Sequence, residues 1–133
     1  MAVRVTEKSR MLIEFPMMMF QRLAVVPLVL EARGLDVTPE MVARLEQVGD
    51  ADTAEILRRI YRDEIGHVAT GLRWFDRICL EHGLNPQAVF QERVRRFFKG
   101  ELKPPFNHQA RAAAGFPKTY YEPLAAGAVT LPS

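Results

Sequence analysis

Residues 50–82 place apolar side chains at steps of three and four, a spacing that predicts one long amphipathic helix. Asp50 or Asp52 is suited to cap its start, and Gly83 is suited to end it. The predicted apolar stripe of this helix consists of Leu57, Ile60, Tyr61, Val68, Gly71, Trp74 or Phe75, and Ile78. No stretch of useful length alternates as a strand would, so other helices must cover the stripe and the chain is predicted to be all-α.

A second helix is predicted from the strongly apolar segment 11–33, which lacks alternation and therefore suits a buried helix. Pro16 is expected to start this helix afresh and Pro27 to kink it, because proline removes a helical hydrogen-bond donor. Gly34 is expected to end it.

Capping signals predict shorter helices further along the chain. Thr38 as a cap and Pro39 in the first helical position predict a short helix that ends at Gly49. The dipeptide Asn85-Pro86 predicts another helix by the same signal.

The chain is accordingly expected to have three parts: a polar lead-in over 1–10, a helical core over 11–100 and a proline-rich tail over 101–133. The tail is expected to pack on the helices. Short helical pieces are predicted within it at 107–114 and around Tyr120.

The composition indicates one modest domain, since the chain has 133 residues and a net charge of +2. A single cysteine, Cys79, excludes an internal disulfide framework and fits a reducing cytosol. The uncharged run 23–30 is far shorter than the roughly 20 residues of a membrane span, and polar residues interrupt the segment that would form a leader. We therefore predict a cytoplasmic protein with no membrane partner.

Glu64 and His67 lie one helical turn apart, and both fall within the predicted apolar stripe, so they are expected to face the core. Glu31 occurs in the otherwise apolar helix over 11–33. Buried carboxylates are costly unless a cation, a hydrogen-bond network or a metal compensates them. Carboxylate and neutral imidazole together suit iron, or manganese, so these three residues are candidate metal ligands. A surface pair or a core salt bridge stays open as the simpler interpretation.

The other reactive side chains favour structural roles. Tyr61, three residues before Glu64, is either a partner of the ligands or a core tyrosine with a bonded hydroxyl. Cys79 has no nearby base and suits a buried, inert thiol. His82 and His108 are expected to be exposed or to cap helix ends.

Several longer motifs resemble a widespread bacterial ferritin-like family of uncharacterised function. The motifs are residues 22–39, 60–69, 73–75, 104–107, 110–111 and 114–116, and the resemblance covers roughly residues 20–122. This chain is similar to the C-terminal half of the proteins in that family. The resemblance implies a ferritin-like helical bundle and metal-ligand roles for Glu31, Glu64 and His67.

The resemblance also implies a function, since ferritin-like bundles of this type hold a di-iron centre through glutamates and Glu-x-x-His motifs. An oxidase or oxygenase is the first expectation. An iron-oxidising or storage protein is the second, and a metal-free helical interaction module is the third. One class of ferritin-like enzymes hydroxylates modified tRNA, which would need a basic surface. The arginines of this chain are more typical of solvated helix faces, so a nucleic-acid partner is not favoured.

The chain is expected to carry only half of the four-helix core, because nothing before Met11 resembles the first ligand-bearing helix pair of the family. A homodimer would supply two copies of Glu31, Glu64 and His67, and a two-fold interface is self-complementary. A separate chain carrying the missing helices is the alternative, and a truncated product without an assembled site is a third. The apolar face over 11–30, which includes Met11, Met17, Met18 and Met19, is the expected interaction surface.

Overall fold

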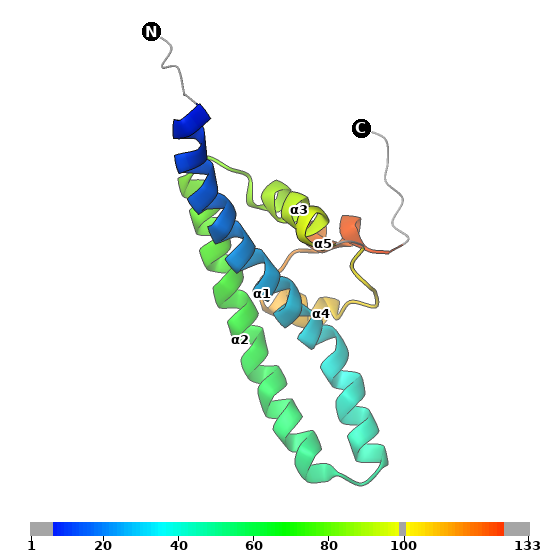
Figure 1. The fold of residues 1–133 in the computed structure, drawn as a ribbon. Helices are drawn as coiled ribbons and strands as arrows, with labels where there is room; N and C mark the ends of the chain where they lie inside the picture. Colours follow the sequence, from blue (N-terminus) through cyan, green and yellow to red (C-terminus); the bar gives the residue numbers. More distant parts are fainter. Residues whose placement is uncertain (1–6, 99–100, 127–133) are drawn as a thin grey trace.

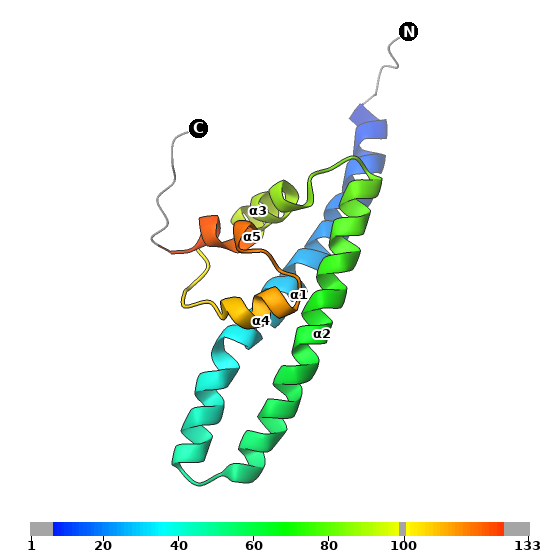
Figure 2. The same ribbon diagram turned by 180° about the vertical axis from the view of Figure 1, so that it is seen from behind.

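The protein is an all-α structure built on one long helical hairpin, as the sequence predicts. The computed structural model describes residues 7–98 and 101–126, with side chains from residue 24 onward, and within these ranges it has no strand. The helices are α1 (Glu7–Gln47), α2 (Ala51–Glu81), α3 (Pro86–Phe97), α4 (His108–Ala113), α5 (Lys118–Tyr121) and a 3-10 turn, η1 (Glu122–Leu124). The three short α-helices lie on one side of the α1–α2 hairpin, whose turn end projects beyond them (Figures 1 and 2).

Helix α1 is longer than predicted, because it runs without a break from Glu7 to Gln47. It begins inside the predicted lead-in, Pro16 lies within it, and Gly34 does not end it. Thr38 does not cap a new helix either, because its hydroxyl donates a hydrogen bond of 2.7 Å back to the carbonyl of Gly34. Threonine in a helix interior commonly bonds the carbonyl one turn earlier, and here that bond replaces the cap.

Pro39 also lies inside α1, although it has no N–H to donate to the carbonyl of Leu35. That carbonyl instead accepts a hydrogen bond of 3.1 Å from the side-chain amide of Asn107, which comes from the start of α4. A contact from the far end of the chain therefore compensates the proline, and sequence reasoning about local signals could not see it.

The predicted turns and caps beyond α1 are confirmed. Gly49 has a φ of +82° and Gly83 a φ of +69°, values that favour glycine, and these residues follow α1 and α2. Asp50 caps α2 by accepting from the Thr53 amide, and Asn85 caps α3 in the same way from its own first turn. The Thr53 hydrogen bonds also lower the pKa of Asp50.

The core lies where α1 and α2 meet the short helices. It comprises Val25, Leu28, Ala32, Leu35, Val68, Leu72, Phe75, Cys79, Phe90, Val94, Ala110, Ala114, Phe116, Tyr120, Tyr121 and Leu124. The predicted stripe of α2 is right at Val68 but wrong at Ile60, which is 52% exposed. Of the two alternatives Trp74 and Phe75, Phe75 is buried and Trp74 is 57% exposed. The turn end of the hairpin lacks a third layer, which explains the exposure of Ile60.

No helix among the described residues is long and apolar enough to cross a membrane. The methionine side chains assigned to an interaction surface, Met11, Met17, Met18 and Met19, lie outside the described side chains.

Candidate metal centre

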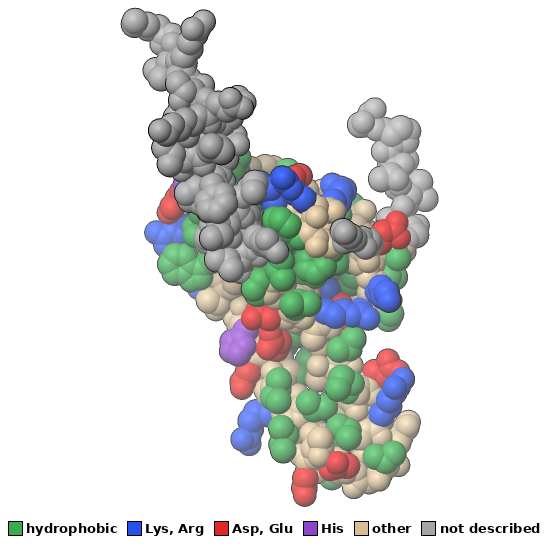
Figure 3. Space-filling model, viewed as in Figure 1, with side chains coloured by type: hydrophobic (Ala, Val, Ile, Leu, Met, Phe, Trp, Pro, Cys, Tyr) green, Lys and Arg blue, Asp and Glu red, His purple; other side chains and the backbone are tan. Residues whose placement is uncertain are grey.

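The three candidate ligands gather on one open face of the α1–α2 hairpin. Glu31 projects from α1, while Glu64 and His67 project from α2. Glu31 and His67 line a cavity of about 400 Å³ together with Ala24, Pro27, Leu28, Thr70, Gly71, Trp74 and Phe75. In Figure 3 a histidine lies beside several acidic side chains on the visible face of the hairpin.

The two residues on α2 interact directly, because Nδ1 of His67 lies 3.4 Å from Oε2 of Glu64. The side chain of Glu64 is 21% exposed and that of His67 is 65% exposed. The expectation that both face the core is therefore wrong for His67, which faces solvent because the described chain places no further helix over this part of the hairpin. Within the described ranges, no three His, Cys, Asp or Glu side chains are placed so that they could hold a metal ion.

The electrostatics of this face are unbalanced toward negative charge. Burial is the main cause that raises the pKa of Glu31, the nearby carboxylate of Glu64 raises it further, and His67 opposes the effect. Among the described residues, no lysine or arginine forms an ion pair with Glu31 or Glu64. Two neighbouring carboxylates without a cation repel each other, so a bound cation would stabilise this arrangement.

Tyr61 does not bond to the candidate ligands. Its hydroxyl accepts a hydrogen bond of 2.8 Å from the side-chain amide of Asn107. The interpretation of Tyr61 as a half-buried tyrosine with a bonded hydroxyl is the one that the structure favours.

A buried ion pair between Asp36 and Arg111 is the main polar feature that sequence reasoning missed. The guanidinium of Arg111 donates two hydrogen bonds, of 2.9 and 2.7 Å, to the two oxygens of Asp36. The Asn107 backbone N–H donates a third, of 2.8 Å, to the same carboxylate. The side chains of Asp36 and Arg111 are only 1% and 4% exposed. Three aromatic rings also surround the guanidinium, those of Phe106, Phe116 and Tyr121.

The pair links α1 to α4 and fixes the tail on the hairpin. A helix end at Gly34 and a new helix start at Thr38 left Asp36 in the connection between them, where no buried partner is needed. The apolar neighbours of Asp36, Leu35 and Val37, together with Arg111 between alanines, are the signal that could have identified the pair.

The histidines outside the candidate centre have structural partners. Nδ1 of His82 lies 2.9 Å from the carbonyl of Ile78, so His82 satisfies the exposed end of α2 as predicted. His108 is half-buried, and its Nδ1 lies 2.8 Å from the hydroxyl of Tyr121. Its ring also stacks on that of Tyr121, whereas 40% of the side chain is exposed, so the predicted exposure of His108 is confirmed only in part.

Several exposed arginines of α2 and α3 pair with glutamates. Arg58 pairs with Glu55 on α2 and with Glu46 on α1, and Arg77 pairs with Glu81. Pairs of this kind are typical of solvated helix surfaces.

Cys79 is buried, as predicted, and we expect it to react slowly. Burial, with a smaller contribution from Asp76, raises the pKa of its thiol from 9.0 to about 11. Because the thiolate is the reactive form, the pKa difference alone lowers the reactive fraction at pH 8 about a hundredfold. Timed labelling with a chromogenic disulfide reagent, in native buffer and in urea, measures this protection. Equal rates in the two conditions would contradict it.

Comparison with known proteins places this chain in a family. A family model described as DUF455, a protein family of unknown function, matches residues 10–122. The chain belongs to this family.

A relative from Haemophilus influenzae, described as an uncharacterized protein, is 41% identical over 101 residues. The matched region is 73% of this chain but only 34% of that protein, so the chain spans about a third of the relative's length. No solved structure matches the chain.

Proposed function

We propose that this chain supplies one half of a ferritin-like di-iron centre, and that a second helix pair completes the site. The observation that carries the proposal is the meeting of Glu31, Glu64 and His67 on one open face of the α1–α2 hairpin. Their oxygen and imidazole donors suit iron, and also manganese. A ferritin-like bundle needs the same donor types from both of its helix pairs.

The electrostatics favour a cation at this face over a purely structural role for the carboxylates. Glu31 and Glu64 are close enough for one charge to raise the pKa of the other, and no described lysine or arginine neutralises them. A metal ion would remove this repulsion. The hydrogen bond between His67 and Glu64 would also orient the imidazole for binding.

A second helix pair would provide what the three residues lack. His67 is mostly exposed and the cavity beside it is open, so the described chain leaves this face uncovered. A second copy of the chain would bring two further glutamates and one further histidine across a two-fold axis. Helices from another polypeptide segment would do the same.

When bound, a carboxylate-bridged iron pair supplies oxygen-activating redox chemistry, whereas the protein supplies binding, orientation and a dry pocket. We therefore favour an oxidase or oxygenase. An iron-oxidising or storage protein would use the same ligands without an organic substrate.

Anaerobic titration with Fe(II), followed by exposure to oxygen, tests the proposal. We expect iron to bind as a pair per completed site, with a near-ultraviolet oxo-bridge band after oxidation. Glu31→Gln, Glu64→Gln and His67→Gln should each weaken iron binding at least about a hundredfold, since loss of supporting residues alone costs up to that much. Glu81→Gln and His82→Gln, two exposed positions on α2 and its end, are matched controls.

Solution mass measured on the same samples links iron binding to assembly. A monomer that binds no iron would contradict the homodimeric site. If no partner segment brings about iron uptake and Glu64→Ala leaves the stability unchanged, the metal-free interaction module is the function that remains. Turnover of an organic substrate would separate an oxygenase from an iron-oxidising protein.

A further inference from the structure

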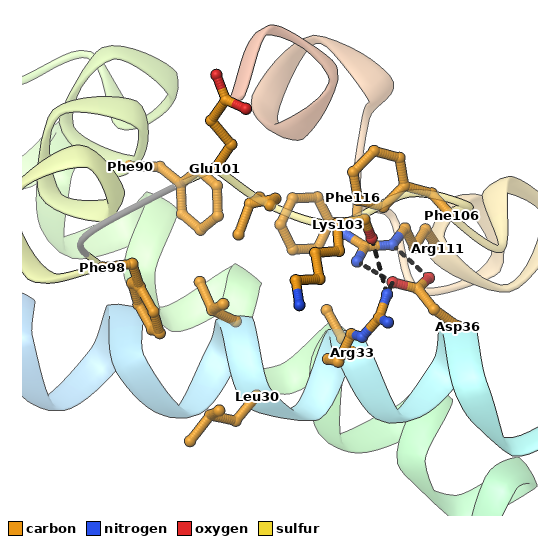
Figure 4. Close-up of a pocket in the computed structure, with 13 residues that line it drawn as sticks. Leu30, Arg33, Asp36, Phe90, Phe98, Glu101, Lys103, Phe106, Arg111 and Phe116 are labelled. Carbon is orange, nitrogen blue, oxygen red and sulfur yellow. Dashed lines mark hydrogen bonds and ion pairs between the residues drawn. The ribbon is translucent and has the colours of Figure 1, made fainter. Parts of the chain in front are cut away.

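A second cavity lies on the opposite side of α1 from the candidate metal centre, and it is lined mainly by aromatic rings. Its volume is about 200 Å³, and α1, α3 and the segment leading to α4 enclose it. Phe90, Phe98, Phe106 and Phe116 contribute to its walls (Figure 4). Val29 on α1 lines this cavity, whereas Glu31 on the same helix lines the cavity of the candidate metal centre. The two sites are therefore separate.

Positive charge at this cavity exceeds what the surrounding acids neutralise. The carboxylate of Asp36 is already paired with Arg111 at 2.7 Å, whereas Arg33 lies 3.8 Å away from it. The guanidinium of Arg33 donates one hydrogen bond, of 2.7 Å, to the backbone carbonyl of Lys103, which neutralises no charge.

Lys103 adds a second cation. Its ammonium group has no partner among the described residues, and in Figure 4 it extends from the cavity wall toward α1. The carboxylate of Glu101 points away from the cavity in the same view. The aromatic walls are therefore bordered by two cations, Arg33 and Lys103, and the Asp36 carboxylate that lies near Arg33 is shared with Arg111.

We infer that this cavity binds a small aromatic carboxylate. A cavity of roughly 150 Å³ accommodates a benzene ring, so about 200 Å³ suits one ring with a short acidic arm. The phenylalanine rings offer edges and faces to such a ring. The carboxylate would meet Arg33, whose planar guanidinium suits carboxylate recognition, and Lys103 as a point charge. Apolar walls with a few convergent polar groups are the usual composition of small-molecule sites.

The inference does not rest on the proposed metal centre, and it can be tested with two molecules of similar shape. Benzoate and the uncharged benzamide would be titrated into the protein, with binding followed by amide chemical shifts in nitrogen-15 spectra. We expect saturable shifts with benzoate, centred on residues 101–106 and on α1 near Arg33. Benzamide should bind about tenfold more weakly or worse, because it lacks the charge.

Variants assign the binding to this cavity. Lys103→Met and Arg33→Met should each weaken benzoate binding about tenfold, whereas Lys118→Met, at an exposed position of α5, should leave it unchanged. Val29→Phe should fill the cavity and prevent binding by both probes. Thermal melting of each variant confirms that it is folded, and the exposed Lys103 keeps the test valid if Val29→Phe does not fold.

Three outcomes would overturn the inference: no saturable binding of benzoate at millimolar concentrations, equal binding of benzamide, or unchanged binding by folded Lys103→Met and Arg33→Met.

Discussion

Replacing Arg111 by methionine is expected to lower the free energy of unfolding by about 3–5 kcal/mol, because it leaves the carboxylate of Asp36 buried without its cation. Both side chains are almost fully buried, and Asp36 accepts two hydrogen bonds from Arg111 and one from the Asn107 backbone. Loss of the guanidinium also removes its contacts with Phe106, Phe116 and Tyr121. Domains of this size are stable by only about 5–15 kcal/mol, so the variant should approach the limit of folding.

Urea unfolding followed by circular dichroism measures the loss. The matched control is Arg96→Met, because the side chain of Arg96 is 55% exposed and its guanidinium lies 4.0 Å from Glu92. It should change stability by less than about 1 kcal/mol.

The double variant Asp36→Leu with Arg111→Met separates loss of charge balance from loss of packing. Removing both partners leaves no unpaired charge, so the double variant should be more stable than Arg111→Met alone. A loss for Arg111→Met no larger than for Arg96→Met would show that the buried pair does not hold α4 on the hairpin.

The same ion pair marks where sequence reasoning succeeds and where it fails. Local signals correctly predicted the all-α class, the caps Asp50 and Asn85, and the helix of residues 51–81, because those features depend on neighbours in the chain. The break predicted at Gly34 failed because distant residues decide the outcome. Asn107 satisfies the carbonyl that Pro39 leaves without a donor, and Arg111 pairs with Asp36, two residues after Gly34.

The candidate metal centre shows a similar division. A three-residue spacing correctly predicted that Glu64 and His67 interact, and the structure brings Glu31 close to both. The exposure of His67 could not be predicted, since it depends on which helices cover the hairpin. Periodicity alone marks a stripe as apolar, and Trp74 on that stripe is 57% exposed for the same reason.

Replacing Trp74 by glutamate is expected to weaken the assembly that completes the metal centre by about thirtyfold or more, since buried tryptophans dominate interface energetics. Trp74 lines the same cavity as Glu31 and His67, and more than half of it is exposed on the described chain. The guanidinium of Arg77 lies 5.7 Å from the centre of its ring. An exposed indole beside an open cavity is an apolar part of the face that a second helix pair would cover.

Trp74→Glu keeps all three candidate ligands but adds a carboxylate to the cavity that two of them line. Trp74→Ala removes the indole without adding a ligand, so its effect on iron reports on assembly. Sedimentation and anaerobic Fe(II) titration are measured on the same samples. Each variant should lose self-association and iron uptake together, and both should recover in part at high protein concentration. Leu80→Glu is the control, because Leu80 is 66% exposed on α2 but does not line the cavity. If Trp74→Ala binds iron as the unmodified chain does, the ligands assemble without a partner on this face. If it loses self-association but Glu64→Gln still binds iron, the assembled site lies elsewhere.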